Sequence, residues 1–134
     1  MPVSFSSILV VDDDPIMLDV LQAFFERHGA RTVNRAQSGA EGIQSLDRHD
    51  DIDLIVSDLH MPGTDGVEFI ELLSARKCRL PLVIVSSASK STVAGASLLA
   101  SAHGLNILGS LAKPVDFVEL GRLLGLPGTP GAGT

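Results

Sequence analysis

An α/β fold with a parallel sheet is predicted by two patterns in this 134-residue chain. Short runs of Val, Ile and Leu recur along the sequence, and stretches with helical spacing and capping signals separate them. Runs that are apolar throughout are typical of strands buried on both faces, as in a parallel sheet covered by helices. Five strand-helix units joined by right-handed crossovers build such a sheet.

The predicted strands differ in composition. Three are uninterrupted apolar runs, and a later one is weakened by Gly and Ser. The second mixes polar and apolar residues, which suits the edge of a sheet. In chain order the strands are expected at 8–11 (ILVV), 31–36 (RTVNRA), 53–56 (DLIV), 82–85 (LVIV) and 105–111 (LNILGSL).

The first helix is predicted from its cap. Asp14 is a favourable N-cap, and Pro15 suits the first helical position. An apolar stripe then continues to a stop near Gly29, and its expected members are Met17, Val20, Leu21 and Phe24.

Four further helices follow the other strands. Ser38 with Glu41 three residues later resembles a capping box for a helix that ends near Arg48. The last helix has Phe117, Leu120 and Leu124 at helical spacing. This last helix is expected at 116–124, and the two helices between it and the capping box are expected at 66–77 and 89–103.

Composition and charge limit the possible functions. The chain is 45% hydrophobic and 19% charged, which is typical of one folded domain, expected at 1–124, with 125–134 as a flexible tail or linker. The net charge is −6, and the first 65 residues hold 12 acids and 4 bases, so we expect no direct binding to nucleic acid or anionic membrane. No secretory signal or membrane span is evident, which favours the cytoplasm, and Cys78 is expected to be an inert thiol.

Polar residues follow four of the predicted strands. In parallel sheets ligands bind at the carboxyl ends of the strands, so we expect these residues to converge. Carboxylates from two strands form a hard oxygen site suited to Mg²⁺, and a lysine with a hydroxyl suits a phosphoryl group. The residues are Asp12, Asp13 and Asp14 after the first strand, Asp58 after the third, Ser86 and Ser87 after the fourth, and Lys113 and Pro114 after the fifth.

An aspartate in such a site can serve as a nucleophile and become an aspartyl phosphate. Asp58 is the candidate, because it opens the segment DLHMPGTDG, whose Pro62, Gly63 and Gly66 predict a tight turn.

Four pieces of the chain, in order, resemble the receiver domain of two-component response regulators: ILVVDDDP, DLIVSDLHMPGTDG, LPLVIVSS and LAKP. The resemblance covers about residues 6–124. It implies a single flavodoxin-like (βα)5 domain, with a five-stranded parallel sheet in the order 2-1-3-4-5 and helices on both faces.

The resemblance also implies a role for each site residue. Asp58 matches the phosphoacceptor, and Asp12 and Asp13 match the acidic pair that holds Mg²⁺, for which Mn²⁺ can substitute. Asp58 itself and the backbone carbonyl of His60 are the expected further metal ligands. Ser86 matches the switch hydroxyl and Lys113 the lysine that pairs with the phosphoryl group. Pro114 is expected to hold the turn, and Asp14 to cap the helix.

Two positions depart from the commonest receiver pattern. Ser110 stands where many receivers carry an aromatic switch residue, which puts the usual coupling in doubt, and Ser87 is expected to narrow access to the site. The segment AHGLNILGSLAKP at 102–114 resembles receivers fused to EAL-type cyclic-di-GMP phosphodiesterase domains, which also lack the aromatic.

The resemblance to receiver domains implies a signalling switch that takes a phosphoryl group from a sensor histidine kinase or a phosphotransfer protein. It would catalyse only its own phosphorylation and dephosphorylation, and act on an output domain or protein. A homodimer is a further hypothesis, because residues 80–112 contain one charged residue, Lys90. The alternatives are a phosphohydrolase with an aspartyl-phosphate intermediate and a pseudo-receiver that binds proteins without phosphorylation. For each of these site residues, the simpler hypothesis is that the side chain only packs, caps a helix or is solvated.

Overall fold

Strands and helices alternate through the computed structural model, which describes residues 5–59, 66–87 and 89–126. The predicted turn residues Pro62 and Gly63, the proposed ligand His60 and the tail from residue 127 lie outside the described residues. The elements are β1 (Ser7–Val11), α1 (Pro15–Arg27), β2 (Thr32–Ala36), α2 (Gly39–Arg48), β3 (Leu54–Ser57), α3 (Gly66–Ala75), β4 (Pro81–Ser86), α4 (Lys90–Ala102), β5 (Asn106–Ala112) and α5 (Phe117–Leu124).

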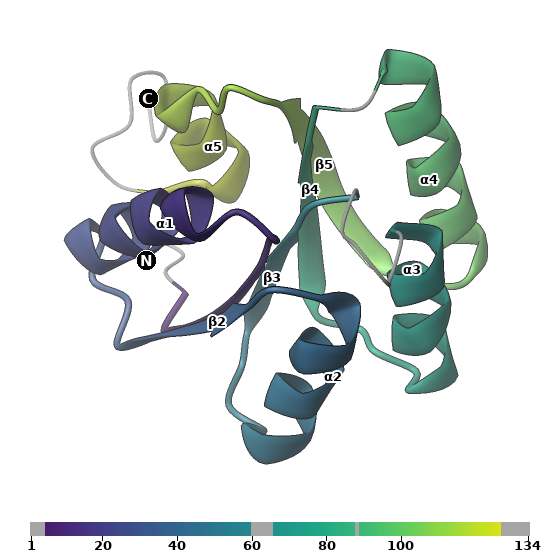
Figure 1. Cartoon of the computed structure of the whole chain (residues 1–134), viewed down its shortest axis with the longest axis horizontal. Coiled ribbons are helices and arrows are strands. Elements are labelled where there is room, and N and C mark those ends of the chain that lie inside the picture. Colours follow the sequence, from purple (N-terminus) through teal and green to yellow (C-terminus); the bar gives the residue numbers. More distant parts are fainter. Residues whose placement is uncertain (1–4, 60–65, 88, 127–134) are drawn as a thin grey trace.

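The five strands form one parallel sheet in the order β2-β1-β3-β4-β5 (Figure 1). This confirms the predicted fold class and strand order. The chain turns to one side after β1 and to the other side after β2, so the strand order reverses between β1 and β3. The carboxyl ends of those two strands are therefore the expected position of a ligand site.

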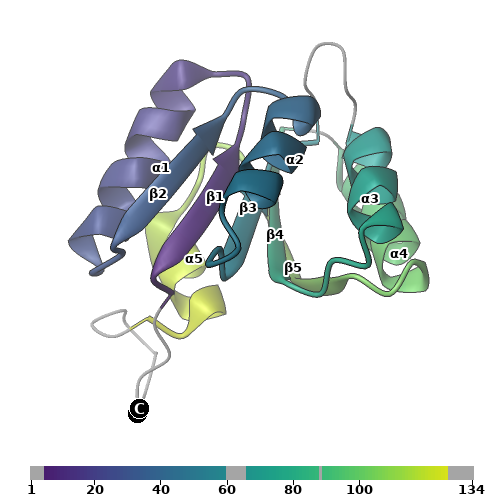
Figure 2. The same cartoon turned by 90° about the horizontal axis from the view of Figure 1, so that it is seen from below.

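Helices cover both faces of the sheet. Figures 1 and 2 show α1 and α5 on one face and α2, α3 and α4 on the other. Each face has its own apolar core, and residues of β1 alternate between them: Ile8 and Val10 pack on the α1 and α5 side, and Leu9 and Val11 on the other. This double burial explains why the strand is apolar at every position.

The predicted stripe of α1 is correct in part. Leu21 is buried, and Met17 and Phe24 are partly buried against the same core, but Val20 is 39% exposed and the fully buried Leu18 and Phe25 were not in the predicted set. Phe24 lies on the flank of the helix, where its ring is 5.2 Å from that of Phe117 on α5. Neighbouring positions of α1 are both apolar, so spacing alone did not determine which of them faces the sheet.

Side-chain caps start the helices as predicted. Ser38 accepts a hydrogen bond from the Glu41 N–H at 3.2 Å, as in a capping box, but the Glu41 carboxylate accepts from the Gln37 N–H and not from Ser38. Asp116 caps α5, and Ser89 caps α4. Within the described parts of the chain, every helix is too short or too polar to cross a membrane.

Candidate metal centre at the carboxyl edge of the sheet

Three carboxylates meet where the strand order reverses. Asp12 and Asp13 follow β1, and Asp58 follows the neighbouring β3, whose Ser57 pairs with Val11 in register. The N–H of Asp58 donates to the Val11 carbonyl at 2.9 Å, which continues the pairing to the end of both strands. Asp12, Asp13 and Asp58 each offer one oxygen within 4.8 Å of the others. The sequence prediction that these residues converge is correct.

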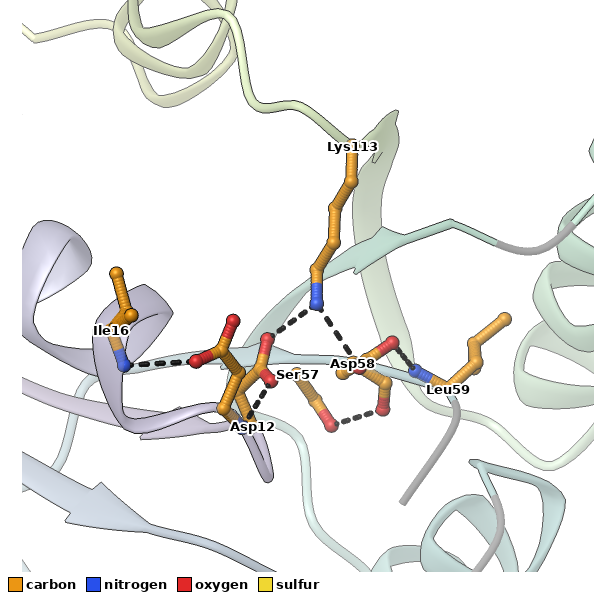
Figure 3. Close-up of polar contacts among 7 residues, drawn as sticks. Asp12, Ile16, Ser57, Asp58, Leu59 and Lys113 are labelled. Carbon is orange, nitrogen blue, oxygen red and sulfur yellow. Dashed lines mark hydrogen bonds and ion pairs between the residues drawn. The ribbon is translucent and has the colours of Figure 1, made fainter.

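Lys113 joins two of these carboxylates. Its ammonium lies 2.7 Å from Asp12 Oδ2 and 3.1 Å from Asp58 Oδ2, as Figure 3 shows. Both carboxylates are buried, with Asp12 at 1% and Asp58 at 5% exposure. The N–H of Lys113 donates to the Ser86 carbonyl at 3.0 Å, so the ends of β4 and β5 together fix the start of this side chain. The ammonium offsets part of the negative charge at the site.

Burial and ion pairing have different effects on the pKa values of Asp12 and Lys113. Burial raises the pKa of Asp12, and the nearby Asp58 adds to that rise, although the hydrogen bonds from Lys113 and from the Asp14 N–H oppose it. Burial alone would lower the pKa of Lys113, but hydrogen bonds and charge attraction from Asp12 and Asp58 raise it overall. Asp12 therefore bears a cost of desolvation that a bound cation would relieve.

The three consecutive aspartates have different contacts. Asp12 is buried and accepts the Asp14 N–H at 2.9 Å. Asp13 is exposed and borders the site. Asp14 is exposed, and its carboxylate accepts the Ile16 N–H at 2.9 Å as the N-cap of α1. The predicted helix-capping role of Asp14 is confirmed.

Backbone and hydroxyl groups also contact Asp58, and sequence reasoning missed them. The Leu59 N–H donates to Asp58 Oδ1 at 2.6 Å, and the Ser57 hydroxyl donates to the Asp58 carbonyl at 2.9 Å. Ser57 is 2% exposed. In the sequence, the one sign of this role of Ser57 was a hydroxyl at the end of an otherwise apolar strand, because a buried hydroxyl needs a hydrogen-bond partner.

The remaining predicted residues lie around this centre. Ser86 is fully buried at the end of β4, whereas Ser87 is exposed. Ser110 is exposed on β5, and together with Ser86 it lines a hollow of about 300 Å³ between α4 and β5. Pro114 is exposed and follows a cis peptide bond. Ser86 thus ends β4 and Lys113 follows the adjacent β5, whereas Ser110 lies within β5, on the opposite side of β4 from β3.

The donor set fits Mg²⁺. Its members are carboxylate oxygens, which are the hard ligands that this ion prefers. One or two protein carboxylates with several waters are its usual arrangement, and exposed Asp13 gives the site a side open to water. Asp12, Asp13 and Asp58 are the described residues that would hold it.

The fold and this acidic centre define an α/β domain with three clustered carboxylates at the switch in strand order. The chain belongs to the response regulator receiver domain family, whose family model matches residues 8–124. Members of this family function in phosphorelay signalling, paired with histidine kinases and output domains.

Curated relatives agree with this assignment. The chain is 34% identical over 109 residues to the transcriptional regulatory protein GlrR of Escherichia coli, covering 81% of this chain and 23% of that protein. It is 31% identical over 115 residues to protein-glutamate methylesterase/protein-glutamine glutaminase 3 of Rhodospirillum rubrum, covering 86% and 30%. The chain therefore spans less than a third of either relative.

Solved structures share the fold. A response regulator receiver protein from Pseudomonas putida superposes with a TM-score of 0.78 at 24% identity, covering 91% of this chain and 97% of that one. One chain of a CheX-CheY-BeF3-Mg complex from Borrelia burgdorferi superposes with a TM-score of 0.76 at 20% identity, covering 89% of this chain and 86% of that one. The fusion to an EAL-type domain remains a prediction.

Proposed function

We propose that Asp58 accepts a phosphoryl group from the phosphohistidine of a sensor histidine kinase or phosphotransfer protein in the cytoplasm. The observation that carries this proposal is the placement of a buried carboxylate beside two further carboxylates and one ammonium. The protein would act as a switch that catalyses only its own phosphorylation and dephosphorylation. Residues 1–124 would form the receiver domain, and 125–134 would lead towards an output domain.

The chemistry divides among the residues of the site. An Asp58 oxygen would form the new bond to phosphorus as the bond from phosphorus to the imidazole nitrogen breaks, and the imidazole leaves. Asp12, Asp13 and Asp58, with the His60 carbonyl, would hold Mg²⁺. When bound, Mg²⁺ supplies positive charge that neutralises the phosphoryl oxygens. The Leu59 N–H orients Asp58 by holding Oδ1.

Phosphorylation would redistribute the contacts of Lys113. A phosphoryl group on Asp58 offers three strong acceptor oxygens, so the ammonium would shift from Asp12 towards them. Ser86 would close on the same group, because it ends the neighbouring strand and its carbonyl binds the Lys113 N–H. Both movements would reshape the surface of α4 and β5.

Metal affinity is expected to depend on the ionisation of Asp12. Magnesium needs the ionised carboxylate, and the pKa of Asp12 is raised, so affinity should fall on acidification at a higher pH than an ordinary aspartate would require. Asp12→Asn should lower Mg²⁺ affinity about tenfold or more. Calorimetric titration at several pH values measures both effects.

Asp12→Asn also tests whether ionisation of Asp12 lowers or raises the free energy of unfolding. A carboxyl whose folded pKa is raised costs stability when ionised, and the cost disappears as pH falls through that pKa. Asp12→Asn should therefore raise the free energy of unfolding at neutral pH without Mg²⁺, and the gain should shrink on acidification. Asp14→Ala is the control, because it should lose about 1 kcal/mol from the helix cap but keep its Mg²⁺ affinity. Equal loss of Mg²⁺ affinity in both variants would contradict these assignments.

We further propose that the face of α4 and β5 binds a second copy of the chain. Leu98 on α4 is 73% exposed, and the edge strand β5 has no charged residue, whereas the opposite edge strand β2 presents Arg35. Natural sheets usually protect an edge with charge, so the uncharged edge is the one suited to an interface. The hollow of about 300 Å³ beside β5 makes this face concave there.

Sedimentation equilibrium tests the second-copy proposal. Mg²⁺ with beryllofluoride, a phosphoryl analogue, should tighten dimerisation about tenfold, which is a typical coupling between sites. Leu98→Glu should abolish the dimer, while Ile16→Glu, an exposed residue on α1, should not. A monomer at all concentrations in both states would overturn the proposal.

A further inference from the structure

The peptide group between Asp58 and Leu59 is held on both of its sides. Its carbonyl accepts the Ser57 hydroxyl at 2.9 Å, and its N–H donates to Asp58 Oδ1 at 2.6 Å. Figure 3 shows the two contacts together. The hydroxyl of one residue is thus linked, through a single peptide plane, to one carboxylate oxygen of the next.

Such a chain of hydrogen bonds is directional. A donor to a peptide carbonyl polarises that peptide and strengthens its N–H as a donor, and this effect is larger away from water. Ser57 is 2% exposed and Asp58 is 5% exposed, so water has little access to either bond. The Ser57 hydroxyl also limits rotation of the peptide plane, and therefore fixes the direction from which the Leu59 N–H meets Oδ1.

The two oxygens of Asp58 consequently have different partners. Oδ1 accepts the peptide N–H, and Oδ2 faces the ammonium of Lys113 at 3.1 Å. Holding Oδ1 fixes the plane of the carboxylate and with it the direction of Oδ2. A reacting carboxylate whose orientation is fixed in advance loses less freedom in the transition state.

We propose that Ser57 is a positioning residue for phosphoryl transfer, which it serves by fixing the Asp58–Leu59 peptide that orients the acceptor carboxylate. The inference rests on the proposed function of Asp58. The Ser57 hydroxyl binds the Asp58 backbone carbonyl and not a carboxylate oxygen of Asp58, so its effect should fall on the rate of transfer more than on Mg²⁺ affinity.

A second buried serine provides a matched control. Ser7 is fully buried at the start of β1, at the opposite end of the strands from the site, where its hydroxyl accepts from Asn34 at 3.3 Å and donates to Asp51 Oδ1 at 3.5 Å. Ser7→Ala removes the same atom from the same kind of strand without touching the site. If Ser57 were only a packing residue, the two alanine variants would have the same consequences.

The test compares Ser57→Ala, Ser57→Thr and Ser7→Ala with the wild type. Both alanine variants should lower the Tm by about 3 °C. Only Ser57→Ala should slow phosphorylation by a small-molecule donor at saturating Mg²⁺, by about tenfold, with Mg²⁺ affinity within about twofold of the wild type. Threonine keeps the hydroxyl and suits a strand, so it should restore the rate.

A spectroscopic readout separates orientation from packing. The Leu59 amide proton should move upfield and exchange faster with solvent in Ser57→Ala, but not in Ser7→Ala, because only the former loses the polarising donor. Wild-type rates in Ser57→Ala, or equal slowing in both alanine variants, would overturn the proposal. A wild-type protein that is not phosphorylated at all would instead refute the proposed function of Asp58.

Discussion

Asp58→Asn is expected to abolish phosphorylation of the chain. The amide keeps the shape and can still accept the Leu59 N–H, but it is not a nucleophile towards phosphorus. Loss of a nucleophile typically reduces the rate by roughly a thousandfold or more. Transfer from a radiolabelled donor, followed by intact-protein mass spectrometry, measures the effect.

A control aspartate lies at the amino-terminal end of β3. Asp53 accepts the N–H groups of Ser6 and Ser7, so Asp53→Asn alters a partly exposed carboxylate contact at the end of the sheet opposite the site. It should leave phosphorylation at the wild-type rate. Full phosphorylation of Asp58→Asn would show that the acceptor is another residue. If the folded Asp58→Asn protein binds its partner as the wild type does, the pseudo-receiver alternative is favoured.

Lys113→Ala is expected to have opposite effects on folding and on metal binding. Without Mg²⁺ it leaves Asp12 and Asp58 as buried neighbouring anions, which should lower the free energy of unfolding by about 2–3 kcal/mol. The ammonium no longer competes for the same carboxylates, so Mg²⁺ affinity should rise about tenfold. Urea unfolding with and without Mg²⁺ measures both changes.

The same variant should separate phosphorylation from switching. Beryllofluoride should still bind Asp58 in this variant, although with lower affinity than in the wild type. At saturation, the resulting shifts in amide resonances of α4 and β5 should be much smaller than in the wild type. Lys90→Ala is the control, because this lysine lies at the start of α4 outside the carboxylate site. Mg²⁺ affinity that is unchanged or reduced in Lys113→Ala would contradict the competition described here.

The sheet and the convergence of the acids were predictable from sequence for a physical reason. A strand covered on both faces must be apolar at each position, so β1, β3 and β4 were evident as continuous runs. Parallel strands end at a common edge, so the residues after β1, β3 and β5 had to approach one another. The strand order itself came from the family resemblance, because spacing does not determine which strands are neighbours.

Other features depended on packing that sequence spacing does not encode. Met17 and Leu18 are both apolar, and only the packing of α1 on the sheet determines that Leu18 is buried and Met17 partly buried. The bond from Ser57 to the Asp58 carbonyl depends on backbone direction at the end of β3, and many buried serines bind backbone without any functional role. The absence of an aromatic at Ser110 was visible, but the hollow beside it required the structure.

The most direct test of the central claim is to locate the phosphoryl group. The wild-type chain is phosphorylated in the presence of Mg²⁺, reduced with borohydride, which converts an aspartyl phosphate to homoserine, and then digested and sequenced by mass spectrometry. The proposed function predicts homoserine at position 58 only, and none when Mg²⁺ is chelated. Homoserine at another aspartate, or stable modification of a different residue with Asp58 intact, would contradict it.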